Sequence, residues 1–230
     1  MASSDKDVPE GMQSFDTPPS VPGKPMSVGQ HMLDKGAAML QSLKPIKMMQ
    51  QHVCTFALYS HDMSRQIETH HFVTRINQEF LQCAVYDSDS PSARLIGVEY
   101  IVSDGVFETL PAEEQKLVPE MVQTAELGNL TKTYGKFWCT WQTDRGDVLP
   151  LGAPSLMMSP QGVPTGMVKP DLLQKRDEKY NISSEDLKKL RVEIAEPEWI
   201  NPNADIWKKT GKGFAVDVEK TEMKCTVPFP

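Results

Sequence analysis

The sequence predicts an α+β fold in which a mainly antiparallel sheet and its flanking helices form a single domain. Residues 51–102 contain the chain's strongest runs of β-forming apolar residues, separated by polar segments of turn-forming residues. Helical patterns lie on both sides of this region, at residues 27–44 and after Pro170. With 230 residues the chain is long enough for one sizeable core, so residues 45–230 are expected to form one domain.

Two N-terminal segments precede this domain. Residues 1–26 are rich in Ser, Pro, Asp and Gly and hold too little apolar surface to offset the entropy of ordering, so a disordered tail is expected. Ser27 and Gln30 form a capping box, which predicts that a helix over residues 27–44 begins there. Its apolar side chains recur on one face: Val28, Met32, Leu33, Met39, Leu40 and Leu43.

The apolar face of this amphipathic helix has two interpretations. The sequence favours docking of the face on the domain core, because an interfacial helix usually carries more Lys and Arg and an aromatic residue on its apolar side. Contact with lipid or with a protein partner is the alternative. The same six residues are therefore also the candidate lipid or partner contacts.

The strands expected at the centre of the sheet follow in order. Residues 52–60 are rich in β-formers and predict a buried strand. Residues 65–75 alternate as a strand would, although a helix is also compatible with them. Residues 80–86 and 94–102 are both apolar, and the polar DSDSPSA segment between them predicts an antiparallel hairpin.

The second half of the chain contains weaker signals. Helix-start residues predict short helices that begin at Pro111, at Pro170 and at Ser183 or Ser184. Strand patterns occur at residues 137–143, at residues 155–159 as an added edge strand, and at residues 214–219 as a last strand. The segment 149–169, which contains the edge strand, is otherwise expected to be an extended loop because it is rich in Pro and Gly.

Charge and composition exclude several functional classes. The net charge of −7 repels phosphate backbones, so nucleic acid is not an expected partner. No apolar run approaches the roughly 20 residues of a spanning helix, and the N-terminus has no signal-peptide core. We therefore expect no transmembrane segment and a reduced cytosolic environment, which four widely spaced cysteines without a C-x-x-C pair also suit. Any membrane contact should be peripheral.

One group of residues has the composition of a metal site. His61, Glu68, His70 and His71 combine imidazole and carboxylate ligands, which suit zinc or iron. On a strand, however, His70 and His71 point to opposite faces, so at most one of them can join Glu68. The sequence favours a structural role, with one histidine hydrogen-bonded in or beside the core, over a ligand cluster. No nucleophile elbow or phosphate-binding glycine loop is present, so a catalytic site is not expected.

Five stretches together indicate a known family. In chain order they are HVCTFALYSHDMSRQIETHH, QCAVYDSDSPSARLIGVEYI, FETLPAEEQKL, KTYGKFWCTWQTDRGDVLPLGAPSLMM and EIAEPEWINP. They resemble the plant oil body-associated proteins, a family whose members in microbes and fungi form a domain of unknown function. The resemblance covers nearly everything after the N-terminal tail. It implies a place on the lipid droplets of seeds, a part in keeping those droplets small and stable, and no established enzymatic activity.

The resemblance also sets the expected partners. They are the oil body surface and its resident proteins, with location at the lipid droplet and in the cytoplasm, and self-association is left open. No cofactor is expected. The alternative is a metal-dependent enzyme of small molecules, or a degenerate relative of one, with zinc or iron bound at His61, Glu68, His70 and His71.

The chain departs from the family at one place. Family members typically carry a W-H-S-H-x-Y-E stretch after the EEQKL helix, whereas here Leu117 runs directly into Val118. A metal site inferred for relatives from that stretch would lose ligands here. Because the missing segment is long enough for a strand and its loop, an interrupted sheet is expected.

Overall fold

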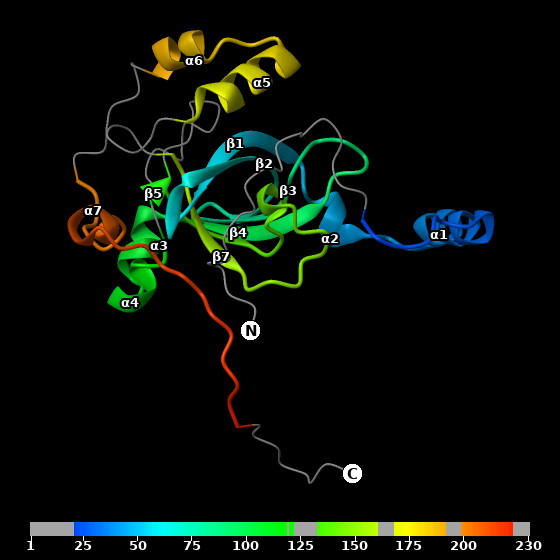
Figure 1. Ribbon diagram of the computed structural model, residues 1–230, viewed down its shortest axis with the longest axis horizontal. Coiled ribbons are helices and arrows are strands. Elements are labelled where there is room, and N and C mark those ends of the chain that lie inside the picture. The colour runs from blue at the N-terminus through cyan, green and yellow to red at the C-terminus, as the bar shows by residue number, and fades with distance from the viewer. Residues whose placement is uncertain (1–20, 119, 122–132, 161–167, 192–198, 223–230) are drawn as a thin grey trace.

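Six antiparallel strands close into a barrel in the computed structural model, which describes residues 21–118, 120–121, 133–160, 168–191 and 199–222 (Figure 1). The barrel strands are β1 (Gln51–Tyr59), β2 (Asp62–Asn77), β3 (Phe80–Tyr86), β4 (Leu95–Ser103), β6 (Thr133–Cys139) and β7 (Ser155–Met158). Around the barrel the order is β1, β2, β3, β4, β6, β7, and β7 returns to β1. The short β5 (Glu120–Met121) pairs with the start of β6. The predicted α+β fold with an antiparallel sheet is confirmed.

Strands β1 to β4 form a meander of consecutive hairpins, because short turns join apolar strands that alternate in side-chain direction. The hairpin predicted at residues 80–102 is confirmed, with Cys83 opposite Glu99. Residues 65–75 form part of the long strand β2 and not a helix. Strand β6 starts four residues before the predicted strand and ends at Cys139.

The barrel closes through strands that are distant in sequence. β4 pairs with β6, and β7 lies between β1 and β6, with Met157 opposite both Tyr59 and Phe137. The prediction of an edge strand at residues 155–159 is therefore wrong, since β7 has a neighbour on each side and all its residues are buried. The expectation of an interrupted sheet is also wrong for these six strands.

Two hydrophobic clusters form the core. The larger one fills the barrel with inward-facing side chains, among them Tyr59, Ile101 and Phe137. The smaller one lies where α3 (Asp104–Glu108) and α4 (Ala112–Gln115) meet the barrel. At its centre the fully buried Phe107 stacks on Tyr134, with 3.7 Å between ring centroids.

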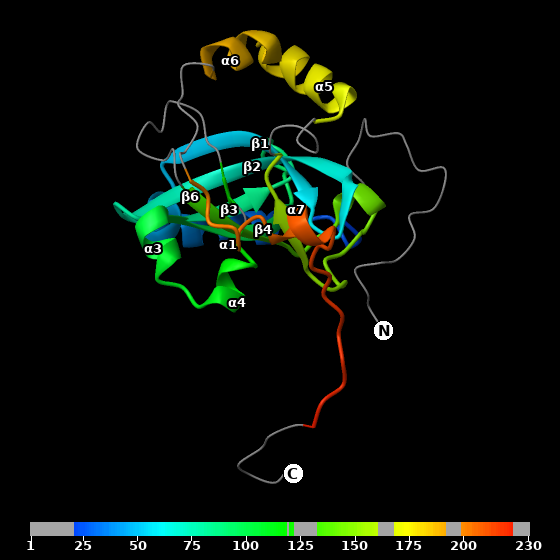
Figure 2. The ribbon, with the colours of Figure 1, turned by 90° about the vertical axis from the view of Figure 1, so that its left-hand side faces the viewer.

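Two further helices cover one side of the barrel. Figures 1 and 2 show α5 (Pro170–Tyr180) and α6 (Ser184–Arg191) above β1 and β2. The guanidinium of Arg176 on α5 lies over the Phe56 ring of β1 at 4.9 Å. Both helices begin where the sequence predicts, and the Ser183 hydroxyl accepts a hydrogen bond from the backbone N–H of Asp186.

The N-terminal helix projects away from the barrel (Figure 1). α1 (Val28–Leu40) begins at the predicted cap, where the Ser27 hydroxyl accepts from the backbone N–H of Gln30 at 3.2 Å, and ends before residue 44. The short α2 (Lys44–Lys47) follows it. None of the α1 residues is buried, so the expectation that its apolar face docks on the domain core is wrong. Among the described residues, no helix combines the length and apolar character that crossing a membrane requires.

The C-terminal segment does not form the predicted strand. After α7 (Ile206–Thr210), residues 211–222 are extended and mostly exposed, and only Asp217 makes an isolated bridge. A segment with alternating side chains forms a strand only where the backbone groups of a neighbouring strand are free to pair with it. In the described residues the ring of strand pairings closes through β7, and residues 214–219 add no strand to it. The predicted disordered tail falls largely on residues 1–20, outside the described residues.

Candidate functional site

Strand β2 directs its histidines to opposite sides of the barrel wall. His70 points outward, toward α5, and His71 points into the barrel, as alternation predicts. His61 lies in the turn before β2, with its ring edge-on to Tyr59. Of the four predicted metal ligands, the structure brings together Glu68 and His70, and it places His61 and His71 elsewhere.

The outer side chains form a polar cluster of His52, Cys54, Glu68 and His70, here called the outer cluster. His70 Nε2 lies 2.9 Å from the Glu68 carboxylate, and His70 Nδ1 lies 3.0 Å from His52 Nε2. In the tautomer whose Nε2–H donates to Glu68, Nδ1 of His70 accepts from Nε2–H of His52. Burial, reinforced by Glu68, raises the pKa of Cys54 to about 12, so this thiol stays protonated at neutral pH.

Helix α5 covers the outer cluster through a contact with the loop between β3 and β4. Asp89 in that loop accepts hydrogen bonds from Lys179 and Tyr180, each at 2.8 Å. The Lys179 ammonium also lies 4.0 Å from Glu68. The positive charge of Lys179 thus balances the carboxylate of the outer cluster.

Substituting Asp89 tests this contact. Hydrogen bonds from Lys179 and Tyr180 lower the pKa of Asp89 to about 2. A lowered pKa stabilises the docked helix above the unfolded-state value of about 3.9, and this contribution is lost as pH falls toward 2. We expect Asp89→Asn to speed amide hydrogen exchange in α5 by about three- to tenfold at pH 7. The difference from the unsubstituted chain should shrink on acidification.

Glu178→Gln is the matched control, because Glu178 lies on the same helix and, among the described residues, accepts a hydrogen bond from Gln174 of that helix. Its exchange rates should equal those of the unsubstituted chain. Equal exchange in the Asp89→Asn variant would show that Asp89 does not hold α5 in place.

Inside the barrel, His71, Cys83 and Glu99 form a second group, here called the inner cluster. All three are buried. His71 Nδ1 lies 2.7 Å from Glu99 Oε2, and His71 Nε2 lies 2.9 Å from the Thr69 hydroxyl. Burial, followed by the Glu99 carboxylate, holds the pKa of Cys83 well above its usual range.

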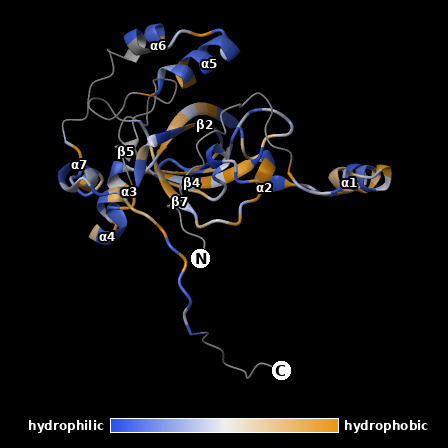
Figure 3. Cartoon of the chain, in the orientation of Figure 1, coloured by the Kyte–Doolittle hydropathy of each residue, from blue (hydrophilic) through white to orange (hydrophobic). Residues whose placement is uncertain are grey.

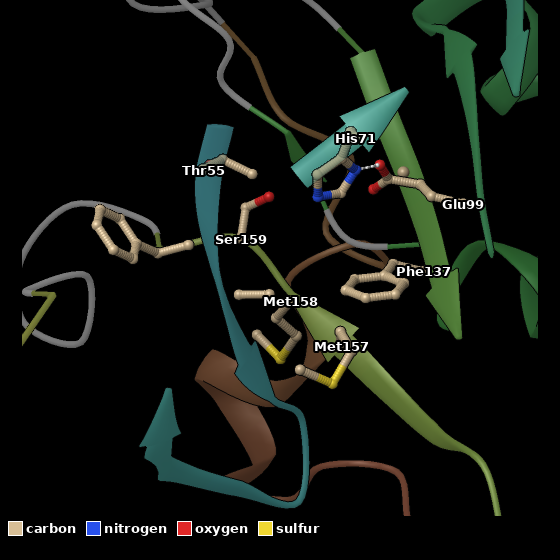
Figure 4. A pocket seen from close by; sticks show the side chains of 10 residues that line it. Thr55, His71, Glu99, Phe137, Met157, Met158 and Ser159 are labelled. Atoms are coloured by element: carbon tan, nitrogen blue, oxygen red, sulfur yellow. Dashed lines mark hydrogen bonds and ion pairs between the residues drawn. The ribbon is translucent and has the colours of Figure 1, made fainter. Parts of the chain in front are cut away.

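A small cavity adjoins the inner cluster. Figure 4 shows His71 and Glu99 on one side of it, with Thr55, Phe137 and Met157 around the remainder. Its volume of about 10 Å³ is close to the minimum for one water molecule, whereas sites for small metabolites measure roughly 300 Å³ or more. The cavity therefore suits water and not an organic substrate.

The candidate lipid or partner contacts lie on an exposed apolar surface. Met39 is 87% exposed and Leu40 is 90% exposed. Figure 3 shows this hydrophobic character on α1 and α2, at the end of the molecule opposite α7. We call it the α1–α2 surface, and it consists of Val28, Met32, Leu33, Met39, Leu40, Leu43, Ile46 and Met48. Ile46 and Met48 lie beyond the helix predicted over residues 27–44, so the sequence pattern does not include them.

Sequence reasoning also missed the partners of the two histidines. Cys54 pairs opposite His70 across the turn at residues 60–61, which folding the two predicted strands together would have revealed. Cys83 faces Glu99 across the predicted hairpin. The signal in both cases was the hairpin register, which residue types alone do not specify.

The comparisons with known proteins agree on one group of relatives. Residues 43–118 and 114–195 match a family described as "Protein of unknown function (DUF1264)". The chain is 58% identical to oil body-associated protein 2B of Zea mays, with 92% of each chain covered. It is also 58% identical to oil body-associated protein 2A of Arabidopsis thaliana, with 91% of this chain and 92% of the relative covered. No solved structure matches the chain significantly.

One relative also bears on the missing stretch. Oil body-associated protein 2B of Arabidopsis thaliana is 54% identical over an alignment of 248 positions that covers both chains completely. This chain has 230 residues, so the relative carries residues that this chain lacks. The two family matches overlap at residues 114–118, which include the junction of Leu117 and Val118 where a stretch is expected to be missing.

Proposed function

The chain belongs to the oil body-associated protein family, and from this premise we propose that it is a peripheral, non-enzymatic protein of the plant oil body. The α1–α2 surface holds it on the droplet, and its coverage of the surface contributes to droplet stability and size. The names of the relatives support the location. The exposed apolar face of α1 supports the mode of attachment.

That exposed face is the observation that carries the proposal. Full burial of one Leu or Met side chain is worth about 1.5–3 kcal/mol, so partial immersion of eight such residues supplies several kcal/mol. Residues 27–48 also contain three lysines and one aspartate. This local positive charge suits a phospholipid surface although the whole chain is acidic.

The experiment is flotation of the tagged full-length chain with isolated oil bodies, followed by washes at high salt and then at alkaline pH. We expect the unsubstituted chain to float and to survive the salt wash, because apolar contact is not screened by ions. Deletion of residues 27–44, or the double substitution Met39→Glu and Leu40→Glu, should reduce the floating fraction at least about tenfold.

The matched control is the double substitution Ala38→Glu and Gln41→Glu, which adds the same charge at the C-terminal end of α1 and at its C-cap but replaces no residue of the α1–α2 surface. This control should float. On artificial triacylglycerol emulsions the same variants should differ in binding as they do on oil bodies. Droplet coalescence should become slower only with the chains that bind. Flotation of the Met39 and Leu40 variant at the level of the control would point to attachment through a resident protein and would contradict the proposal.

A further inference from the structure

The inner cluster joins three metal-ligand side chains from three adjacent strands. His71 comes from β2, Cys83 from β3 and Glu99 from β4. Cys83 is the direct cross-strand partner of Glu99, and His71 lies diagonally beside Cys83, whose partner on β2 is Val73. One ligand atom from each of the three side chains lies within 4.8 Å of the other two.

The burial of Glu99 needs a compensating charge. Burial of a carboxylate costs several kcal/mol of hydration free energy, and pairing with a positive charge offsets this cost. Within the described part of the chain, its ion-pair partner is His71, and no Lys or Arg nitrogen lies within 4.0 Å of it. The barrel interior is mainly apolar, with side chains such as Tyr59, Ile101 and Phe137, and it encloses a carboxylate with little charge compensation.

We propose that the inner cluster binds a zinc ion through His71 Nδ1, Cys83 Sγ and a Glu99 carboxylate oxygen. A thiolate and a carboxylate together neutralise Zn²⁺, so the loaded site would leave no net charge in the barrel. The sulfur ligand favours zinc over calcium or magnesium. Bond lengths near 2.1 Å in a tetrahedron place the nitrogen and oxygen about 3.4 Å apart, so these two atoms need to separate by less than about 1 Å.

The surroundings of His71 fit a zinc ligand. The Thr69 hydroxyl donates a hydrogen bond to the Thr55 carbonyl, so the Thr69 oxygen can accept a hydrogen bond from His71 Nε2–H. That contact orients the ring with Nδ1 directed at Glu99. On metal binding Nδ1 would give up its proton and offer its lone pair to zinc, while the bond to Thr69 keeps the ring in place. The adjoining cavity, which has room for about one water molecule, supplies the fourth coordination position (Figure 4).

The outer cluster contains the same ligand types but is less suited to a metal. Glu68 is partly exposed and already has the Lys179 ammonium at 4.0 Å. A metal there would bind against that positive charge and would compete with water for the carboxylate. Cys54 is therefore the matched control for Cys83, because both are thiols beside a histidine and a glutamate. The zinc site is independent of attachment to the droplet.

The test uses the full chain with Cys54→Ala and Cys225→Ala, which removes two other thiols. Purified without chelator, it should contain about one zinc per chain, and after stripping it should gain thermal stability when zinc chloride is added. Cobalt in place of zinc should give a thiolate-to-cobalt charge-transfer band. Adding Cys83→Ala should remove the band and weaken zinc binding by at least about 100-fold, since loss of an outer-shell partner alone costs 10- to 100-fold.

Two further measurements guard against a variant that does not fold. Glu99→Gln should weaken zinc binding but keep the charge-transfer band, because the sulfur remains. X-ray absorption on the zinc-loaded chain with Cys83 intact should show one sulfur near 2.3 Å and nitrogen or oxygen neighbours near 2.0–2.1 Å. Any one of three results would overturn the site: zinc does not stabilise the stripped chain, the zinc coordination shell contains no sulfur, or the cobalt charge-transfer band survives Cys83→Ala.

Discussion

Gly97→Ala is expected to lower the free energy of unfolding by more than about 4 kcal/mol, a large part of the stability of a typical domain. Gly97 lies on β4 opposite Cys139 of β6, where the barrel closes. A Cβ at this position would lie 2.2 Å from the backbone oxygen of Trp138 and 2.7 Å from the Phe137 ring. Relief of these overlaps requires β4 and β6 to move apart, which breaks the ladder. Urea denaturation followed by circular dichroism measures the loss.

Gly36→Ala is the control for this substitution. Gly36 lies in the middle of α1, and an added Cβ there meets no atom within 4 Å. Alanine should favour the helix locally by about 1 kcal/mol, yet global unfolding should change by less than about 0.5 kcal/mol because α1 does not pack on the barrel. Equal denaturation midpoints for the two alanine variants would contradict the close packing of β4 against β6.

Phe107→Ala is expected to cost about 3–5 kcal/mol of unfolding free energy. Phe107 is fully buried in the smaller core, where its ring stacks on Tyr134 at an interplanar angle of 9°. Removal of the ring leaves a cavity between α3 and the start of β6 and also loses the aromatic contact. Thermal and urea unfolding measure the effect.

Phe107→Leu serves as the matched substitution. It keeps an apolar side chain of similar volume, so its cost should stay below about 1.5 kcal/mol, mostly from the lost stacking. If the alanine and leucine variants both unfold like the unsubstituted chain, the smaller core does not unfold together with the barrel.

The sequence was sufficient for the local parts of the fold. The hairpin of β3 and β4 was predicted because two apolar runs flank one turn segment, and the cap of α1 was predicted because Ser27 and Gln30 lie three residues apart. Closure of the barrel depends on pairs such as Tyr59 with Met157, and no local pattern encodes that contact. For this reason the sequence pattern predicts β7 as an edge strand, and it predicts a last strand at residues 214–219 that the described sheet does not contain.

The candidate site shows the same division. Alternation along β2 predicted that His70 and His71 face opposite sides. Cys54 comes from the neighbouring strand β1, and Glu99 comes from β4, which is separated from β2 by β3. The register of these strands follows from the hairpins and not from residue type. An apolar stripe likewise indicates that a helix face packs against a partner, but it does not identify the partner. The sequence therefore predicts that the face of α1 packs on the domain core, whereas in the structure this face is exposed.

The position of β7 constrains how the chain acquires its fold during synthesis. Because β7 is the strand that joins β1 to β6 in the part of the chain that the structure describes, a nascent chain that ends before Ser155 holds a curved but open sheet. Both free edges then present unpaired backbone groups, which are templates for association with other chains. The meander can form early from near neighbours, whereas closure waits for a contact of high sequence separation and is the slow step. Exposure to aggregation thus ends only when Met157 pairs with Tyr59.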